Sequence, residues 1–256
     1  MKKINWHHRY LQQAAWTSDL RDYLFDKTHL SQAHRVLEVG CGTSAILSTL
    51  QTSASLHGID LDAAALSVGA QYPERAQGVI APLQNIFLTR GDALSLPYSN
   101  QSFDITYCHF FLLWVKNPLQ ALIEMKRVTK PNGYVFALAE PDYTARTDQP
   151  DELAILGKLQ NESLQRQGAD ISLGARLADL FFRAGIKIVE TGAIQSREND
   201  ALSLEEWQNE WAVIESDLAE SVSEKEIARL KKLDEGARLH RTRVLNVPTY
   251  FAWGQV

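Results

Sequence analysis

The chain of 256 residues is 45% apolar and 22% charged, with a formal net charge of −5 and an isoelectric point near 5.8. This composition predicts a folded α/β domain with a sizeable core rather than a disordered or low-complexity chain. The acidic balance argues against a nucleic-acid-binding protein, because phosphate binding needs a concentrated basic surface. One short basic run, Arg238, Arg241 and Arg243, is interpreted as a solvated helix face.

Cysteine usage and the apolar runs suggest a compartment. Cys41 and Cys108 are the only cysteines, too few for a disulfide framework and without the spacing of a zinc site, so we expect no metal. Lys2 and Lys3 are not followed by the apolar core of a signal peptide. The longest apolar run, 110–115, is far too short to span a membrane. A reduced, cytoplasmic protein is therefore expected.

Residues 5–30 are predicted to form an amphipathic helical region, the N-terminal cap, that packs over the sheet edge or the ligand mouth. Large apolar residues recur there at roughly helical spacing, and they are Trp6, Tyr10, Trp16, Leu20 and Leu24. Such an aromatic stripe is more often core than ligand contact. The pair His7–His8 and Arg21 are expected at the surface.

The stretch Arg35–Ala45, RVLEVGCGTSA, is predicted to be a buried strand, a glycine turn and the start of a helix over 44–51 capped by Thr43 or Ser44. Gly40 and Gly42 have no Cβ, so a ligand can approach the main chain closely. A helix N-terminus would also present unpaired N–H groups and a partial positive charge. A polar or anionic ligand is expected there.

Two acidic residues follow the next two predicted strands. Asp60 ends the strand 55–60, twenty residues beyond Gly40, at the separation where a carboxylate accepts hydrogen bonds from a ribose. In the alternative, Asp60 only caps the helix beginning near Asp62. Asp92 follows the strand 86–90 and is placed to accept a hydrogen bond from the amine of an adenine, although a Gly-Asp pair alone is a turn signal.

Strands and helices alternate along the rest of the core. The expected helices and strands are 63–72, 86–90, 102–109, 117–129, 134–139, 153–167, 173–184, 186–190 and 249–253. The pattern predicts a doubly wound, mostly parallel seven-stranded sheet whose ligands bind beyond the carboxyl ends of the strands. His109 and Glu140 fall at such ends. We expect a single domain over 1–256, with an N-terminal cap at 1–30, a core at 31–190, a helical insertion at 200–245 and the last strand within 246–256.

These residues resemble the class I S-adenosylmethionine-dependent methyltransferases, within them the small-molecule, quinone-biosynthesis type. The resemblance rests on VLEVGCGTSA at 36–45, HGIDLD at 57–62, RGDALSLPYSNQSFD at 90–104, EMKRVTKPNGYVFALAEPD at 124–142 and LADLFFRAGIKIVE at 177–190. It implies a Rossmann-like methyltransferase fold and S-adenosylmethionine as the cofactor, with S-adenosylhomocysteine as its product. Ser44 departs from the family by standing where a third glycine is usual, and Trp114 stands where many relatives have a polar residue.

The resemblance also implies roles for individual residues. Glu38, Gly40, Cys41 and Gly42 would hold the methionine part of the cofactor. Asp60, followed by Leu61, would bind the ribose, and Asp92 with Ala93 would bind the adenine. Cys108 and His109 would line the cofactor near its methyl group.

The expected reaction is methyl transfer to an oxygen, nitrogen or carbon of a small molecule by in-line displacement, in which the protein aligns the reactants and excludes water. His109 is the first candidate for a general base, followed by Glu140 and Asp142, although His109 could merely pack against the cofactor. One alternative is an NAD-dependent oxidoreductase, because the glycine turn with Asp60 also fits a relaxed dinucleotide fingerprint. The other is a non-catalytic cofactor-binding or scaffold protein.

The acceptor itself is not encoded in any recognised motif. Aromatic residues outside the core motifs would suit an aromatic or lipid-like acceptor, and they would equally suit a core or a homodimer contact. These residues are Trp6, Tyr10, Trp16, Tyr143, Trp207 and Trp211.

Overall fold

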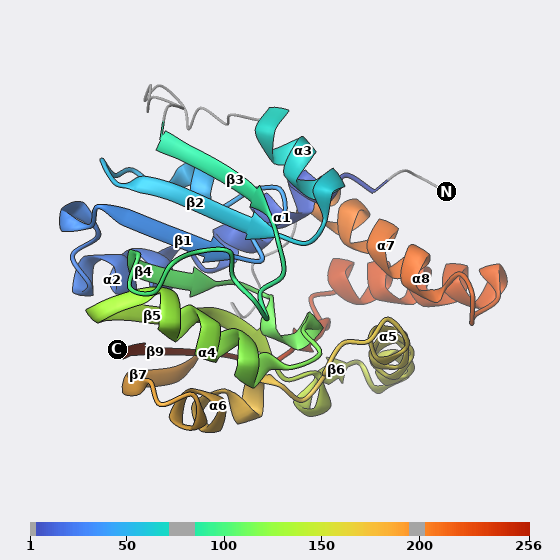
Figure 1. Cartoon of the computed structure of the whole chain (residues 1–256). Helices are drawn as coiled ribbons and strands as arrows, with labels where there is room; N and C mark the ends of the chain where they lie inside the picture. The colour runs from blue at the N-terminus through green and yellow to red at the C-terminus, as the bar shows by residue number, and fades with distance from the viewer. Residues whose placement is uncertain (1–3, 72–84, 195–202) are drawn as a thin grey trace.

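A computed structural model of the protein describes residues 4–71, 85–194 and 203–256 (Figure 1). Its centre is a seven-stranded sheet in the order β3-β2-β1-β4-β5-β9-β7. The strands are β1 (Arg35–Val39), β2 (Ser55–Asp60), β3 (Ile86–Arg90), β4 (Phe103–Cys108), β5 (Thr129–Pro141), β7 (Lys187–Ile194) and β9 (Thr249–Gln255). Only β9 runs antiparallel to its neighbours, β5 and β7. The predicted doubly wound, mostly parallel seven-stranded sheet is confirmed.

Helices cover both faces of this sheet. Those against the sheet are α1 (Trp6–Trp16), α2 (Ser18–Lys27), α3 (Ala63–Gln71), α4 (Pro118–Val128) and α6 (Leu177–Arg183). Three further helices, α5 (Ala154–Arg166), α7 (Leu204–Leu218) and α8 (Glu224–Leu239), lie beyond one edge of it. One apolar layer joins α4 and α6 to the sheet through side chains such as Met125 and Phe181. The opposite layer packs Phe25 of α2 against Tyr107 and Phe136. Within the described ranges, no helix combines the length and apolar composition needed to cross a membrane.

The segment after the glycine turn differs from the prediction. The helix expected over 44–51 is wrong, because only a single 3-10 turn, Leu47–Thr49, forms there. Ser44 has φ = 61°, a left-handed conformation that interrupts a right-handed helix, so neither Thr43 nor Ser44 caps one. The Thr49 hydroxyl also donates back to the carbonyl of Ile46 at 2.7 Å, in the local competition with helix formation that is typical of Ser and Thr. The turn therefore lacks the helix dipole that the sequence suggested.

Several strand boundaries also differ from the expected ones. β5 begins at Thr129 instead of 134. β7 ends at Ile194, four residues beyond 190, and β9 ends at Gln255, two residues beyond 253. Residue 72, expected to end α3, and most of the connection after it lie outside the described residues, as do 200–202 of the insertion. A short antiparallel pair was not predicted: β6 (Thr147–Gln149) with β8 (Val244–Asn246).

A helical cap, defined here as α5, α7, α8, β6 and β8, lies on the side toward which the arrows of the parallel strands point (Figure 1). It has an apolar core of its own, and Leu156, Trp211, Leu218 and Leu230 are almost fully buried in it. Trp207 and Trp211 belong to this core. Of the roles left open for them, acceptor contact, core or homodimer contact, they therefore have the core role. The cap therefore adds a second packed layer beyond the carboxyl edge of the sheet.

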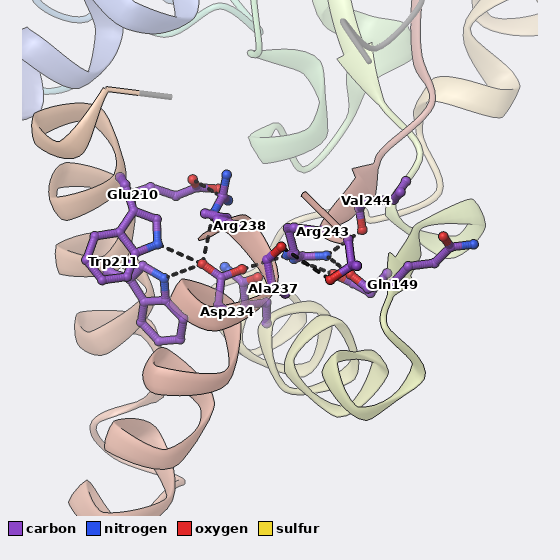
Figure 2. Close-up of polar contacts among 12 residues, drawn as sticks. Gln149, Glu210, Trp211, Asp234, Ala237, Arg238, Arg243 and Val244 are labelled. Carbon is purple, nitrogen blue, oxygen red and sulfur yellow. Dashed lines mark hydrogen bonds and ion pairs between the residues drawn. The ribbon is translucent and has the colours of Figure 1, made fainter. Parts of the chain in front are cut away.

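A buried carboxylate organises the polar part of the cap (Figure 2). Asp234 accepts hydrogen bonds from the indole N–H groups of Trp207 and Trp211 at 2.7 and 2.9 Å. It also accepts from the Nε atoms of Arg238 and Arg243 at 2.9 and 2.6 Å. Burial opposes ionisation, but the hydrogen bond from Trp211 and the charge of Arg238 outweigh it and lower the pKa of Asp234.

Arg243 continues this network to the β6–β8 pair. Its Nη2 lies 2.7 Å from Oδ1 of Asp148, whose Oδ2 is 2.7 Å from Nε of Arg146. The side chain of Arg243 is only 4% exposed. The interpretation of the basic run as a solvated face is therefore wrong for Arg243 and for the half-buried Arg238, because both arginines fold inward to the one carboxylate of Asp234.

The network generates a stability prediction. Asp234→Asn removes the charge shared by the buried Arg243 and the half-buried Arg238, and leaves each with one carboxylate partner, Asp148 and Glu210. The free energy of unfolding should therefore fall by about 3 kcal/mol, the lower end of the cost of breaking a buried pair. Urea denaturation followed by far-UV circular dichroism would measure the change. Glu226→Gln is the control, since Glu226 pairs with Arg229 on the exposed face of the same helix and its loss should be undetectable. Equal effects of the two substitutions would contradict the role given to Asp234.

Candidate active site

The glycine turn is tied to the end of the neighbouring strand. The backbone N–H groups of Gly40 and Cys41 donate to the carbonyl of Ile59 at 2.8 and 3.1 Å. Oδ2 of Asp60 accepts from Gly42 N at 2.7 Å, and Oδ1 accepts from Asp62 N at 2.9 Å. Asp62, whose Oδ1 accepts from the next turn of backbone, caps α3 instead of Asp60. Asp60 is partly exposed and keeps lone pairs for further donors.

Aromatic rings occupy the space that the two glycines leave. Gly40 and Gly42 have φ of 73° and 50°, which glycine adopts without strain. A Cβ on Gly40 would stand 2.0 Å from Cδ2 of Phe111, and one on Gly42 would stand 3.1 Å from Cε2 of Tyr10. Phe111 and Tyr10 thus occupy, in this structure, the space in which a ligand is expected from the sequence.

Asp92 lies at the end of the next strand. The N–H of Gly91 donates to the carbonyl of Asp60 at 3.0 Å, which keeps the two strand ends together. The exposed carboxylate of Asp92 accepts from Leu94 N at 2.9 Å through Oδ1, as in a turn. Ala93 is half-buried against the core, and Leu61 is 65% exposed. Asp60 and Asp92 thus stand beside each other along one edge of the sheet.

Glu38 lies beneath the turn, on the α2 side of the sheet. It is buried and accepts a hydrogen bond from the Tyr107 hydroxyl at 3.1 Å. Burial raises the pKa of Glu38 to about 8, although the Tyr107 bond and the charge of Arg21 act in the opposite direction. Arg21 is also buried and donates to the carbonyl of Ala14 at 2.8 Å, so its expected surface position is wrong. The turn from α1 into α2 encloses its guanidinium.

The two cysteines are buried thiols of low reactivity. Cys41 and Cys108 are buried, and burial together with nearby carboxylates raises the pKa of both thiols well above the usual value. Thiolates are the reactive form of cysteine, so neither side chain is a nucleophile at neutral pH. Both remain suited to packing.

The surroundings of His109 make it a weak base. Nε2 of His109 lies 3.0 Å from the hydroxyl of Thr17 at the end of α1. Burial, with a smaller effect of the Arg21 charge, lowers the pKa of His109 to about 3. A general base works best when its pKa lies near the working pH, and this imidazole lies far below it. His109 is neutral at pH 7 and is held toward α1.

The other two candidate bases, Glu140 and Asp142, accept hydrogen bonds from backbone N–H groups. Glu140 is fully buried and accepts from the N–H groups of Phe111, Leu112 and Leu113 at 3.1, 2.9 and 3.3 Å. Burial raises its pKa to about 7 while these three bonds oppose the rise. Asp142 caps the 3-10 turn Tyr143–Ala145 by accepting from the next turn of backbone. Both carboxylates shape the loops around the site.

Helix α1 reaches the glycine turn at the sheet edge, where the cap at residues 5–30 is expected, but its individual contacts were not predicted. His7 Nδ1 lies 2.8 Å from the hydroxyl of Thr43, so its expected surface position is wrong. Tyr10 covers Gly42, and Thr17 at the other end of the helix meets His109. The sequence held a signal for these contacts, because positions 7, 10, 14 and 17 follow helical spacing and so lie on one face of the helix.

A family model described as a methyltransferase domain matches residues 37–137, which include the glycine turn, Asp60, Asp92 and β4. Less than half of the chain thus matches a methyltransferase domain in sequence. The match covers the strands that carry the acidic residues. The N-terminal helices and the helical cap lie outside the matched residues.

Individual relatives agree with the family. The demethylmenaquinone methyltransferase of Staphylococcus epidermidis is 34% identical over 122 residues, which are 46% of this chain and 48% of that protein. The chain thus matches about half the length of this relative. The [4+2]-cyclase SpnF has a similar fold at a TM-score of 0.58 and 19% identity, covering 93% of this chain and 79% of that one. A phosphoethanolamine N-methyltransferase of Haemonchus contortus, in complex with S-adenosyl-L-methionine, has a TM-score of 0.56 and 15% identity, over 87% and 48%.

The contact between Phe111 and Gly40 is open to a double-mutant test. Gly40→Ala should destabilise the protein by about 2–5 kcal/mol, from the left-handed φ and from overpacking against the ring. In a Phe111→Ala background only the φ cost of about 1–2 kcal/mol should remain. Thermal and urea unfolding of the four proteins would measure the coupling. Additive effects would show that the ring does not pack on Gly40.

Proposed function

We propose that the protein transfers a methyl group from S-adenosylmethionine to a small-molecule acceptor. The supporting observation is the edge where Asp60 and Asp92 follow neighbouring strands beside a turn of two glycines with positive φ. The domain match covers the same edge. Bound here, the cofactor would supply a methyl group already activated on a sulfonium.

The residues present fit this cofactor. Asp60 retains lone pairs for the ribose hydroxyls, and the exposed carboxylate of Asp92 can accept from the adenine amine. Glu38, buried with a raised pKa, gains a favourable partner when a cation arrives. The remaining proposed contacts are packing contacts from Cys41, Leu61, Ala93, Cys108 and His109. Phe111 has to turn away from Gly40 wherever a ligand takes its place.

The chain's own contribution to the reaction is position and exclusion of water. Good alignment of reactants supplies about 7–11 kcal/mol of a barrier, more than a base usually does. His109 is a weak base here, and Glu140 and Asp142 already hold backbone N–H groups. We therefore propose that His109 contacts the cofactor, and that Glu140 and Asp142 keep the site in shape.

The nature of the acceptor is a further part of the proposal. The relatives named above include demethylmenaquinone methyltransferases, which favours an aromatic or quinone-like small molecule. The fold alone leaves the chemistry open, because a [4+2]-cyclase shares it. The two alternatives from the sequence, an NAD-dependent oxidoreductase and a non-catalytic binding protein, gain no support from the family match.

Calorimetric titration separates a site for S-adenosylmethionine from a site for a nicotinamide dinucleotide. S-Adenosylhomocysteine should bind, because the edge offers acceptors for a ribose and an adenine amine. NADH should not bind, because residues 44–51 form no α-helix whose N-terminus could hold its pyrophosphate. Asp60→Asn should weaken binding about 10- to 100-fold by removing charge-assisted hydrogen bonds. Asp179→Asn, an exposed acid on α6, is the control and should leave the affinity unchanged. Binding of NADH alone would overturn the proposal.

The raised pKa of Glu38 gives the binding a pH dependence. A cationic ligand pairs with the ionised form, and with a pKa of about 8 that form is the minor one at pH 6–7.5. Affinity for S-adenosylmethionine should therefore rise with pH in this window, by up to about tenfold per unit. Glu38→Gln should remove the rise. An identical slope in the variant would show that Glu38 does not pair with the ligand's charge.

A further inference from the structure

A second face of α1 carries two side chains with N–H donors, Arg9 and Gln12, which are hydrogen-bonded to each other. Nη1 of Arg9 donates to Oε1 of Gln12 at 3.0 Å, and the Arg9 guanidinium stacks 4.9 Å above the ring of Trp16. Stacking and the bond to Gln12 hold the guanidinium in one orientation. Among the residues that the structure describes, Arg9 has no carboxylate within ion-pair distance. Four of its five N–H donors are left for other partners.

Gln12 adds a donor that is buried and unpaired. Its Nε2 has no hydrogen-bond partner within the described part of the chain. Exchanging the amide oxygen and nitrogen does not solve this, because arginine only donates and the oxygen must face Arg9. A buried N–H group without a partner costs about 1–3 kcal/mol, so an acceptor atom at this point is strongly favoured.

These donors lie between the glycine turn and the helical cap. Tyr10, adjacent to Arg9, covers Gly42, and Nδ1 of His8 lies 3.0 Å from Nδ2 of Asn209 on α7. Burial raises the pKa of Tyr143 and of Asp217, and the charge of Arg9 opposes both rises, so both groups are within its electrostatic reach. Tyr143 follows Glu140 and Asp142 at the end of β5.

We propose that Arg9 and Gln12 bind an anionic oxygen of the methyl acceptor, which is therefore an acidic small molecule, a carboxylic acid or an acidic phenol or enol. The proposal rests on the proposed function. Planar, fixed guanidinium donors suit an oxyanion, and the adjacent amide N–H supplies a second bond. Asp217 carries the same charge as such a ligand when it is ionised, but burial raises its pKa and so weakens this opposition.

An acidic acceptor also agrees with the state of the candidate bases. If the nucleophile is the ionised oxygen, its proton has already been lost to water before it binds, and the methyl group moves from sulfur to that oxygen. His109, with a pKa of about 3, and the two occupied carboxylates then need not take a proton. The donors on α1 would favour the anion over the neutral acid.

The test measures binding by the full chain loaded with S-adenosylhomocysteine. A metabolite extract is separated at pH 7 on an anion exchanger into a retained acidic pool and an unretained neutral pool. Each pool is brought to equilibrium by dialysis with the wild type and with variants, and enriched compounds are measured by mass spectrometry. We expect the wild type to enrich a compound from the acidic pool.

Variants assign that enrichment to the two donors. Arg9→Gln and Gln12→Met should each reduce it about tenfold or more, and Arg9→Lys should recover part of it. Arg229→Gln, the same substitution on the exposed face of α8, should not change it. Unchanged affinity for S-adenosylhomocysteine in every variant shows that the fold is intact.

Two failures are distinguishable. A wild type that does not bind S-adenosylhomocysteine overturns the proposed function. Three results would overturn only the assignment of Arg9 and Gln12, in a wild type that does bind S-adenosylhomocysteine. They are enrichment from the neutral pool only, enrichment from neither pool, and equal enrichment of acids by the wild type and by Arg9→Gln.

Discussion

The hydrogen bond from Gly42 N to the carboxylate of Asp60 is the contact on which the site depends. It joins the end of β2 to the turn after β1, and it satisfies a backbone donor that a regular helix start would otherwise leave open. Since no α-helix follows the turn, the bond and the pairing of Gly40 N with Ile59 O fix the backbone instead. Two residues with positive φ on either side of Cys41 become compatible with a strand end for this reason.

Buried carboxylates show how differently the chain treats similar groups. Asp234 meets two arginines and two indoles, and its pKa falls because these donors outweigh burial. Glu140 meets three neutral N–H groups and Glu38 meets one hydroxyl and a more distant arginine, and burial raises the pKa of both. The ion pairs of Asp234 connect elements of the cap, whereas Glu38 and Glu140 are neutralisable acids at the sheet edge, where a ligand's charge would act.

Local sequence was sufficient for the sheet and for much of its edge. Buried parallel strands such as 35–39 and 55–60 are short apolar runs between turn signals, so they could be located from the sequence, as could Asp60 and Asp92 at their ends. The helix over 44–51 could not be rejected locally, because Ser44 takes its left-handed φ where α3 presses on the turn: a Cβ on Gly69 would lie 2.8 Å from the carbonyl of Thr43.

The contacts missed from the sequence are long-range. Thr17 and His109 are 92 residues apart, and Arg243 and Asp148 are 95 apart, so no local pattern links them. An arginine in a basic run has the same appearance in sequence whether it faces water or a buried acid. The three-dimensional fold decides between the two, as it does for Arg21 and His7.

Helix α1 connects the two halves of the molecule. One of its faces touches Thr43 and His109 at the sheet edge, and another meets α7 through His8 and Asn209. The cap has its own core and its own ion network, so it behaves as a body against which α1 can be held. A ligand at the glycine turn and a ligand at Arg9 would order the same helix. Binding of either would then strengthen binding of the other, by the same factor in both directions, because the coupling of two sites is reciprocal.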